Sequence, residues 1–179
     1  LYMSMLEPEL QKETIYLLEQ AKGNTSLAIR EIRNLSHRLA PAFFDESSLE
    51  ESMERLINDF SIGTEIRIDC VVSEQVHTLQ MGHDLQLNLY RILQEQLRNI
   101  QKYSLASKVD ICVDLGDGDL SMQISDNGVG FDMSRVKKGI GIANMKRRAE
   151  LFGGKAVIIS EPGQGCQVLV TIPLNRSTE

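Results

Sequence analysis

The chain has 179 residues, enough for one or two domains with a sizeable buried core. Its formal net charge is -6, and no run of Lys and Arg forms the basic face that a nucleic-acid binder needs, so we expect no contact with nucleic acid. No apolar run reaches the length of about 18 residues that a membrane span requires. We therefore expect the portion present to be soluble and cytoplasmic, while a parent protein in the inner membrane stays open.

The first forty residues carry the pattern of a long helix. Core-type positions from Leu10 to Leu39 recur in steps of three and four, and Pro41 ends the pattern. One helix cannot bury such a seam alone, so we expect a helical hairpin that pairs with a second copy of the chain as a four-helix bundle. The alternative, a helix packed on its own globular domain, stays open. We assign residues 1–42 to this helical region and residues 43–179 to a globular domain.

The rest of the chain mixes strands and helices. Ser47 and Ser48 are candidate N-caps of a short helix that reaches about Phe60. Beyond it, alternating apolar residues predict strands, and spacings of three and four predict helices. The expected elements are a strand over 64–72, a helix over 84–103, strands over 109–115 and 120–125 joined by a tight turn, a helix over 142–152 closed by glycines, and strands over 156–160 and 167–172. With both long helices on one face of the sheet, this order predicts an α+β fold, a two-layer α/β sandwich.

Three cysteines lie far apart in strand-like runs, and none forms a C-x-x-C pair. They are Cys70, Cys112 and Cys166. Free cysteines behave as small apolar residues, so we expect buried thiols in a reducing compartment.

The first cluster of chemically capable residues lies on the helix predicted over 84–103. Glu95, Asn99 and Lys102 follow one another at spacings of four and three, which places them on one helix face. An amide oxygen is a good ligand for Mg²⁺, a carboxylate can accept a proton, and an ammonium group can pair with phosphate. Taken alone, the same spacing is common on solvated helix faces.

The second cluster, Asp126-Asn127-Gly128-Val129-Gly130, directly follows a predicted strand. Asp126 can accept a hydrogen bond from an exocyclic amine there, and the two glycines allow the backbone to come close to a ligand. An ordinary tight turn is the alternative for this segment.

The third cluster opens a helix. Gly139 and Gly141 expose free backbone N–H groups and the positive end of the helix dipole, which favours phosphate. Neither the dinucleotide fingerprint nor a P-loop fits the surrounding sequence. Residues 131–138 form a short polar segment that includes Lys138 and could close over a bound nucleotide as a lid. A solvated loop is the alternative.

Together, the three clusters resemble the N, G1 and G2 boxes of the GHKL ATPases, a superfamily that includes gyrase, the ninety-kilodalton chaperone, histidine kinases and mismatch-repair ATPases. The phrases EIRNLSHRLAP, SSLEESMERLINDF, LYRILQEQLRNIQKYS and GIGIANMKRRAELFGG are similar to the branch of sensor histidine kinases that signal to response regulators of the NarL class. The closing phrase GQGCQVLVTIPL resembles the usual end of the family.

This resemblance implies ATP and Mg²⁺ as cofactors and assigns a role to each matching residue. Asn99 would bind Mg²⁺, Glu95 would assist activation of the acceptor or of metal-bound water, and Lys102 would contact phosphate. Asp126 would read the adenine amino group. The remaining nucleotide-binding positions are Gly128 and Gly130 at the adenine and Lys138, Gly139, Gly141 and Ile142 at the phosphates. Catalysis would consist of positioning and charge stabilisation during transfer of the γ-phosphoryl group.

The resemblance also implies a phosphoacceptor histidine, and none of the three histidines fits that role. His37 is followed by Arg38 and lies in the long helix that ends at Pro41, which we expect to be the second helix of the hairpin. His83 begins the helix of Asn99, and His77 is expected in a loop without a partner. We expect the acceptor helix to lie outside the chain, so that the chain alone binds ATP without autophosphorylation. Cys166 stands where relatives often have Thr near the adenine, and Tyr103 where His is frequent.

The function implied is transfer of phosphate from ATP to a histidine and then to an aspartate of a response-regulator receiver domain. The homodimer would form through the N-terminal helix, and the parent would be anchored in a membrane or linked to a PAS domain upstream, a choice that the sequence leaves open. The alternatives are a hydrolytic GHKL ATPase, an anti-sigma serine kinase and a pseudokinase that only dimerises. Intact Glu95, Asn99 and Asp126 argue against the pseudokinase.

Overall fold

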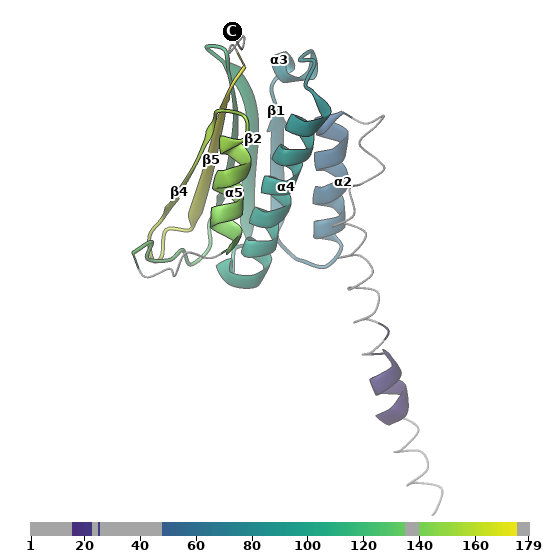
Figure 1. Cartoon of the computed structure of the whole chain (residues 1–179). Helices are drawn as coiled ribbons and strands as arrows, with labels where there is room; N and C mark the ends of the chain where they lie inside the picture. Colours follow the sequence, from purple (N-terminus) through teal and green to yellow (C-terminus); the bar gives the residue numbers. More distant parts are fainter. Residues whose placement is uncertain (1–15, 23–24, 26–47, 135–139, 175–179) are drawn as a thin grey trace, which may run out of the picture. The chain divides into compact units, whose positions relative to one another are not determined.

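The computed structural model describes residues 16–22, 25, 48–134 and 140–174. The chain divides into two compact units, Leu1–Phe43 and Phe44–Glu179. In the first unit, residues 16–22 are helical and are drawn in purple in Figure 1. Most of the predicted heptad seam, including Pro41, lies outside the described residues, so the dimerisation helix stays a prediction.

The second unit is built on a five-stranded sheet with the strand order β1-β2-β3-β5-β4. The strands are β1 (Arg67–Val72), β2 (Lys108–Gly116), β3 (Asp119–Asp126), β4 (Lys155–Ser160) and β5 (Cys166–Pro173). All neighbouring strands are antiparallel except β1 and β2, which are parallel. A parallel pair needs a long crossover between its strands. Here the crossover contains the helix that carries the first cluster of predicted site residues.

The helices of this unit lie on one face of the sheet (Figure 1). They are α2 (Leu49–Ser61), the short α3 (Glu74–His77), α4 (His83–Asn99), a π-helical turn η1 (Ile100–Ser104) and α5 (Ile140–Glu150). Figure 1 shows α2, α4 and α5 packed side by side against the sheet. The predicted two-layer α+β sandwich is therefore confirmed, whereas α3 and the π-helical turn were not predicted.

Alternating side chains explain why the sheet buries only this face. Val109, Ile111 and Val113 of β2 are buried, and the residues between them are exposed. The same alternation runs through β3, β4 and β5. The apolar side of α4 covers this face, and Leu89 and Leu93 are almost completely buried. The core thus forms between the sheet and the helices, and the ends of the strands and helices remain available for a site.

Local sequence signals define several element boundaries. Ser48 begins α2 with a capping box, because its side chain accepts a hydrogen bond from the Glu51 N–H at 3.2 Å while its own N–H donates to Glu51 Oε2 at 3.1 Å. The β2–β3 turn places Asp117 and Gly118 at φ 52° and 83°, as the favoured two-residue hairpin turn requires. Within the described part of the chain, no helix combines the length and apolarity of a transmembrane span.

Candidate functional site

The first wall of the candidate site is the C-terminal end of α4 and its π-helical continuation. Glu95 and Asn99 lie one helical turn apart, and Glu95 Oε2 forms an ion pair with Arg98 Nη1 at 3.5 Å. The helix then widens into η1, which ends at Leu105 in the left-handed conformation with φ 52°. π-Helical turns are rare and occur frequently at functional sites. This one carries Lys102 to the same cavity as Asn99.

Asp126 forms the opposite wall, at the last residue of β3. The residue is only 7% exposed. Oδ1 accepts a hydrogen bond from the Gly128 N–H at 2.9 Å, whereas Oδ2 is buried without a hydrogen-bond partner. Burial raises the pKa of this carboxyl above its ordinary value. A buried acceptor without a donor is expensive, so this atom is placed for a ligand that brings its own donor.

Two glycines allow the segment after Asp126 to fold against its neighbours. A Cβ atom on Gly128 would lie 2.7 Å from Ser104 Cβ and even closer to the Ser104 carbonyl oxygen. Gly130 has φ +58° and packs against the backbone of Gly165. Gly128 therefore lies directly against η1, and Gly130 lies against the connection between β4 and β5, so a larger side chain at either position would displace the segment from one of these neighbours.

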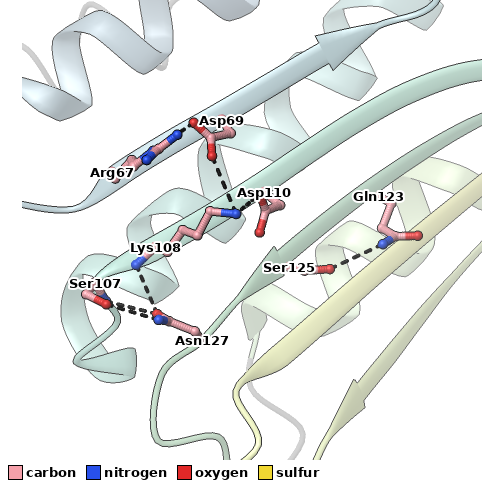
Figure 2. A network of polar contacts seen from close by, with 8 residues as sticks. All are labelled: Arg67, Asp69, Ser107, Lys108, Asp110, Gln123, Ser125 and Asn127. Carbon is pink, nitrogen blue, oxygen red and sulfur yellow. Dashed lines mark hydrogen bonds and ion pairs between the residues drawn. The ribbon is translucent and has the colours of Figure 1, made fainter.

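Asn127 fixes this segment from the outer side of the sheet, a role that the sequence did not reveal. Its Oδ1 accepts hydrogen bonds from the backbone N–H groups of Ser107 at 3.0 Å and Lys108 at 2.9 Å. Its Nδ2 donates to Ser107 Oγ at 3.0 Å. Figure 2 shows these contacts beside the ion pairs of Lys108 with Asp69 and Asp110. Asn127 thus anchors the residue that precedes it, Asp126.

The N-terminus of α5 closes the site above Glu95. A Cβ atom on Gly141 would meet the carboxylate of Glu95, with its Cδ at 3.3 Å. Ile142, one residue further, is partly buried and faces the same cavity. Lys138 and Gly139 lie outside the described residues, so their predicted contacts with phosphate stay predictions.

These walls enclose one cavity of about 500 Å³. It brings together seven of the predicted site residues: Glu95, Asn99, Lys102, Asp126, Gly130, Gly141 and Ile142. Gly128 does not line the cavity and instead supports Asp126 from behind. The lining residues to which the sequence analysis gave no role come from separate elements and are both polar and apolar: Gln96, Arg98, Ile100, Tyr103, Ser104, Phe131, Ile140 and Ile158. No signal local to the sequence distinguishes such residues from ordinary core or surface residues.

Two expectations about cysteine and histidine were wrong. Cys70 and Cys112 are exposed, because β1 is an edge strand and Cys112 lies on the uncovered face of the sheet; only Cys166 is buried. His77 is not in a loop without a partner. It ends α3, and its Nδ1 lies 2.6 Å from Glu50 Oε2 of α2. His83 begins α4, as predicted.

Cys166 pairs with Asp126 across β3 and β5 and lines the cavity, whereas its expected place near the adenine stays a prediction. Burial, and secondarily the Asp126 charge, raise the pKa of this thiol to about 11. Cys166 is therefore a neutral thiol at neutral pH. Among the described residues, no group of three or more His, Cys, Asp and Glu side chains is arranged to hold a metal ion.

Comparisons with known proteins identify the family to which this fold belongs. Residues 84–176 match the family described as histidine kinase-, DNA gyrase B- and HSP90-like ATPase. The chain is 30% identical over 163 residues to the sensor histidine kinase LiaS of Bacillus subtilis (strain 168). This alignment covers 90% of this chain and 44% of LiaS. It is 34% identical over 161 residues to the sensor histidine kinase MctS of Rhizobium johnstonii, covering 85% of this chain and 34% of MctS.

The fold agrees with a solved histidine kinase structure. The histidine kinase domain of the blue-light activated kinase EL346 from Erythrobacter litoralis superposes with a TM-score of 0.59 at 16% identity, covering 70% of this chain and 59% of that one. The matched region of this chain contains all three sequence clusters. The chain therefore belongs to the family of histidine kinase-, DNA gyrase B- and HSP90-like ATPases, which confirms the resemblance to GHKL kinases and implies that the chain binds ATP. It spans less than half the length of the two curated relatives.

Proposed function

We propose that the chain is the catalytic region of a sensor histidine kinase. It would bind ATP with Mg²⁺ and transfer the γ-phosphoryl group to a histidine, from which an aspartate of a response-regulator receiver domain would take it. The observation that carries this proposal is the unpartnered Oδ2 of Asp126, buried at the wall of the cavity that also receives Asn99 and Gly141. The named kinases among the relatives support the same reading.

The residues present fit an adenine nucleotide at both ends of the cavity. At the apolar end, Asp126 offers a hydrogen-bond acceptor to the amino group of the base, and Ile158 and Phe131 offer apolar surface to its ring. At the other end, Lys102 offers positive charge to the phosphates, and the start of α5 offers the positive end of a helix dipole. The lining therefore offers both features that a nucleoside triphosphate requires, an acceptor with apolar surface for the base and positive charge for the phosphates.

Asn99 and Glu95 would supply the remaining functions. The Asn99 side chain offers a neutral oxygen ligand for Mg²⁺, and the bound ion would neutralise the phosphate charge that develops during transfer. Glu95, one turn earlier, would accept a proton at the site of attack and is held by its ion pair with Arg98. We further propose that the kinase acts as a homodimer formed through the N-terminal helix, as the heptad pattern predicts.

The decisive experiment measures binding of ATP by calorimetry with and without Mg²⁺. The chain should bind ATP, Mg²⁺ should strengthen binding, and Asn99→Ala should abolish most of the Mg²⁺ effect. Gln101→Ala is the matched control, because Gln101 is exposed on η1 and does not line the cavity. Absence of ATP binding by the unaltered chain would contradict the proposal. In the parent protein, kinase activity should appear as a phosphate that is labile in acid and stable in base.

A further inference from the structure

A second polar side chain lies at the base-reading end of the cavity, and its own hydrogen bonding is poor. Gln96 of α4 is only 3% exposed, yet it lines the cavity. Its Nε2 donates to the sulfur of Cys166 at 3.8 Å. Thiol sulfur is a weak acceptor, and a carboxamide carries two N–H donors. Because buried polar groups normally have good partners, this amide has donor capacity to offer a ligand.

Gln96 and Asp126 approach Cys166 from different elements. The β3–β5 register pairs Asp126 directly with Cys166, whose thiol is the acceptor for Gln96. The Asp126 charge also contributes to the raised pKa of the Cys166 thiol. An amide donor and an unpartnered carboxylate acceptor therefore flank one thiol in the cavity wall.

This pair of groups matches the hydrogen-bonding edge of one purine. On its Watson–Crick edge, adenine presents the N6 amino donor next to the N1 acceptor. Guanine presents the reverse order, with the O6 acceptor next to the N1–H donor. An acceptor beside a donor in the protein therefore fits adenine and leaves guanine with two unfavourable contacts.

We propose that Gln96 is a specificity-determining residue that donates a hydrogen bond to N1 of adenine, next to the amino group that Asp126 accepts. This inference rests on the proposed function, because it concerns the same nucleotide. It adds a second base-reading group to the carboxylate, and it explains why a carboxamide is buried in the cavity wall with only a thiol as its acceptor. Selection of adenine over guanine would thus depend on α4 as well as on β3.

The test pairs one substitution with one altered ligand. Gln96→Met keeps a similar length and removes the donor, and 1-deaza-ATP replaces the N1 acceptor by C–H. A lost hydrogen bond of ordinary strength should weaken ATP binding about five- to tenfold. The same substitution should leave the affinity for 1-deaza-ATP unchanged, because that ligand cannot accept the bond in either protein. Gln96→Met should also lower the ratio of the affinity for ATP to the affinity for GTP.

Controls separate this role from a structural one. Gln94→Met makes the same chemical change two residues away, at a side chain that accepts from Arg91 and does not line the cavity. It should leave the affinity for both nucleotides unchanged. Gln96→Leu, which has no hydrogen-bonding group, serves as a second variant if Gln96→Met does not fold. Equal weakening of ATP and 1-deaza-ATP, or no weakening of ATP, would overturn the inference while the proposed ATP binding stands. An unaltered chain that binds no ATP would instead remove the proposed function.

Discussion

The Asn127 Oδ1 atom accepts a hydrogen bond from the backbone N–H of Lys108 at 2.9 Å, which joins the turn after β3 to the start of β2 (Figure 2). On the opposite side of this turn, the Val129 N–H donates to the Ser104 carbonyl oxygen at 2.7 Å. The turn is therefore held between β2 and η1. Because Asp126 precedes it and η1 carries Lys102, this junction sets the spacing of two elements that both line the cavity.

We expect Asn127→Ala to destabilise the chain and to weaken ATP binding. The substitution removes three side-chain hydrogen bonds and leaves backbone N–H groups of the β2 start without their acceptor. Loss of such bonds should lower the free energy of unfolding by about 1–3 kcal/mol. Urea unfolding measures the loss, and Asn144→Ala, at an exposed position of α5, is the control. Equal effects of the two substitutions would show that the junction contributes nothing specific.

Asp126→Asn should separate stability from function. The unaltered side chain buries an ionisable oxygen without a partner, and an amide can still accept the Gly128 hydrogen bond through its own oxygen. We therefore expect the variant to be as stable as the unaltered chain or more stable near pH 7, but to bind ATP at least about tenfold more weakly, as loss of a charge-assisted hydrogen bond predicts. A variant that loses stability and retains affinity would contradict the base-reading role.

The raised pKa of Asp126 predicts how the difference in stability between Asp126→Asn and the unaltered chain depends on pH. Burial raises the pKa above the ordinary 3.8, so the folded chain binds this proton more tightly than the unfolded chain. The resulting stability is fully present below pH 3.8 and is lost as the pH rises through the folded pKa. The stability advantage of Asp126→Asn should therefore shrink when denaturation is measured in acid instead of near neutral pH. If the stability advantage of Asp126→Asn instead increased in acid, the pKa of Asp126 would not be raised in the folded chain.

Gly128→Ala should damage the site through the backbone. The added Cβ would meet the Ser104 carbonyl oxygen, and it would lie 2.8 Å from Asp126 Oδ1. Since a carbonyl in a packed turn has little room to move, we expect a loss of about 1–3 kcal/mol in the free energy of unfolding, together with weaker ATP binding. Gly116→Ala is the matched control, because a Cβ atom there meets nothing within 4 Å. Thermal unfolding of the two variants measures this loss, and equal midpoints for Gly128→Ala and Gly116→Ala would contradict the prediction.

The elements that the sequence predicted well are those encoded over short distances. The alternation in β2 and β3, the cap at Ser48 and the turn at Gly118 each depend on neighbouring residues, and each was found where expected. Spacing along one helix placed Glu95 and Asn99 on one face for the same reason. Convergence of the three clusters on one cavity needed the family resemblance, because no local pattern relates α4, β3 and α5 in space.

What the sequence could not predict depends on tertiary packing. The parallel pairing of β1 leaves Cys70 on an edge strand, and the contact between α2 and α3 gives His77 its acidic partner. Gln96 directly follows Glu95, a predicted site residue, but in the sequence alone it does not differ from an ordinary polar residue of a helix. Its contact with Cys166 of β5 is a tertiary contact, between residues 70 positions apart in the sequence. The described residues leave the predicted lid and dimerisation helix untested.

Gly141→Ala offers a contrast to Gly128→Ala, because the obstacle is the end of a side chain. The new Cβ would displace the Glu95 carboxylate, which can move without disturbing the backbone. Alanine also favours a helix over glycine by up to about 1 kcal/mol. We therefore expect unchanged or slightly higher stability together with a loss of phosphoryl transfer in the parent protein, if Glu95 acts as proposed. Combining Gly141→Ala with Glu95→Ala should cost no more activity than Glu95→Ala alone, since the displaced group is then absent. Additive losses in this double-mutant cycle would show that Gly141 serves the site through its backbone and not through Glu95.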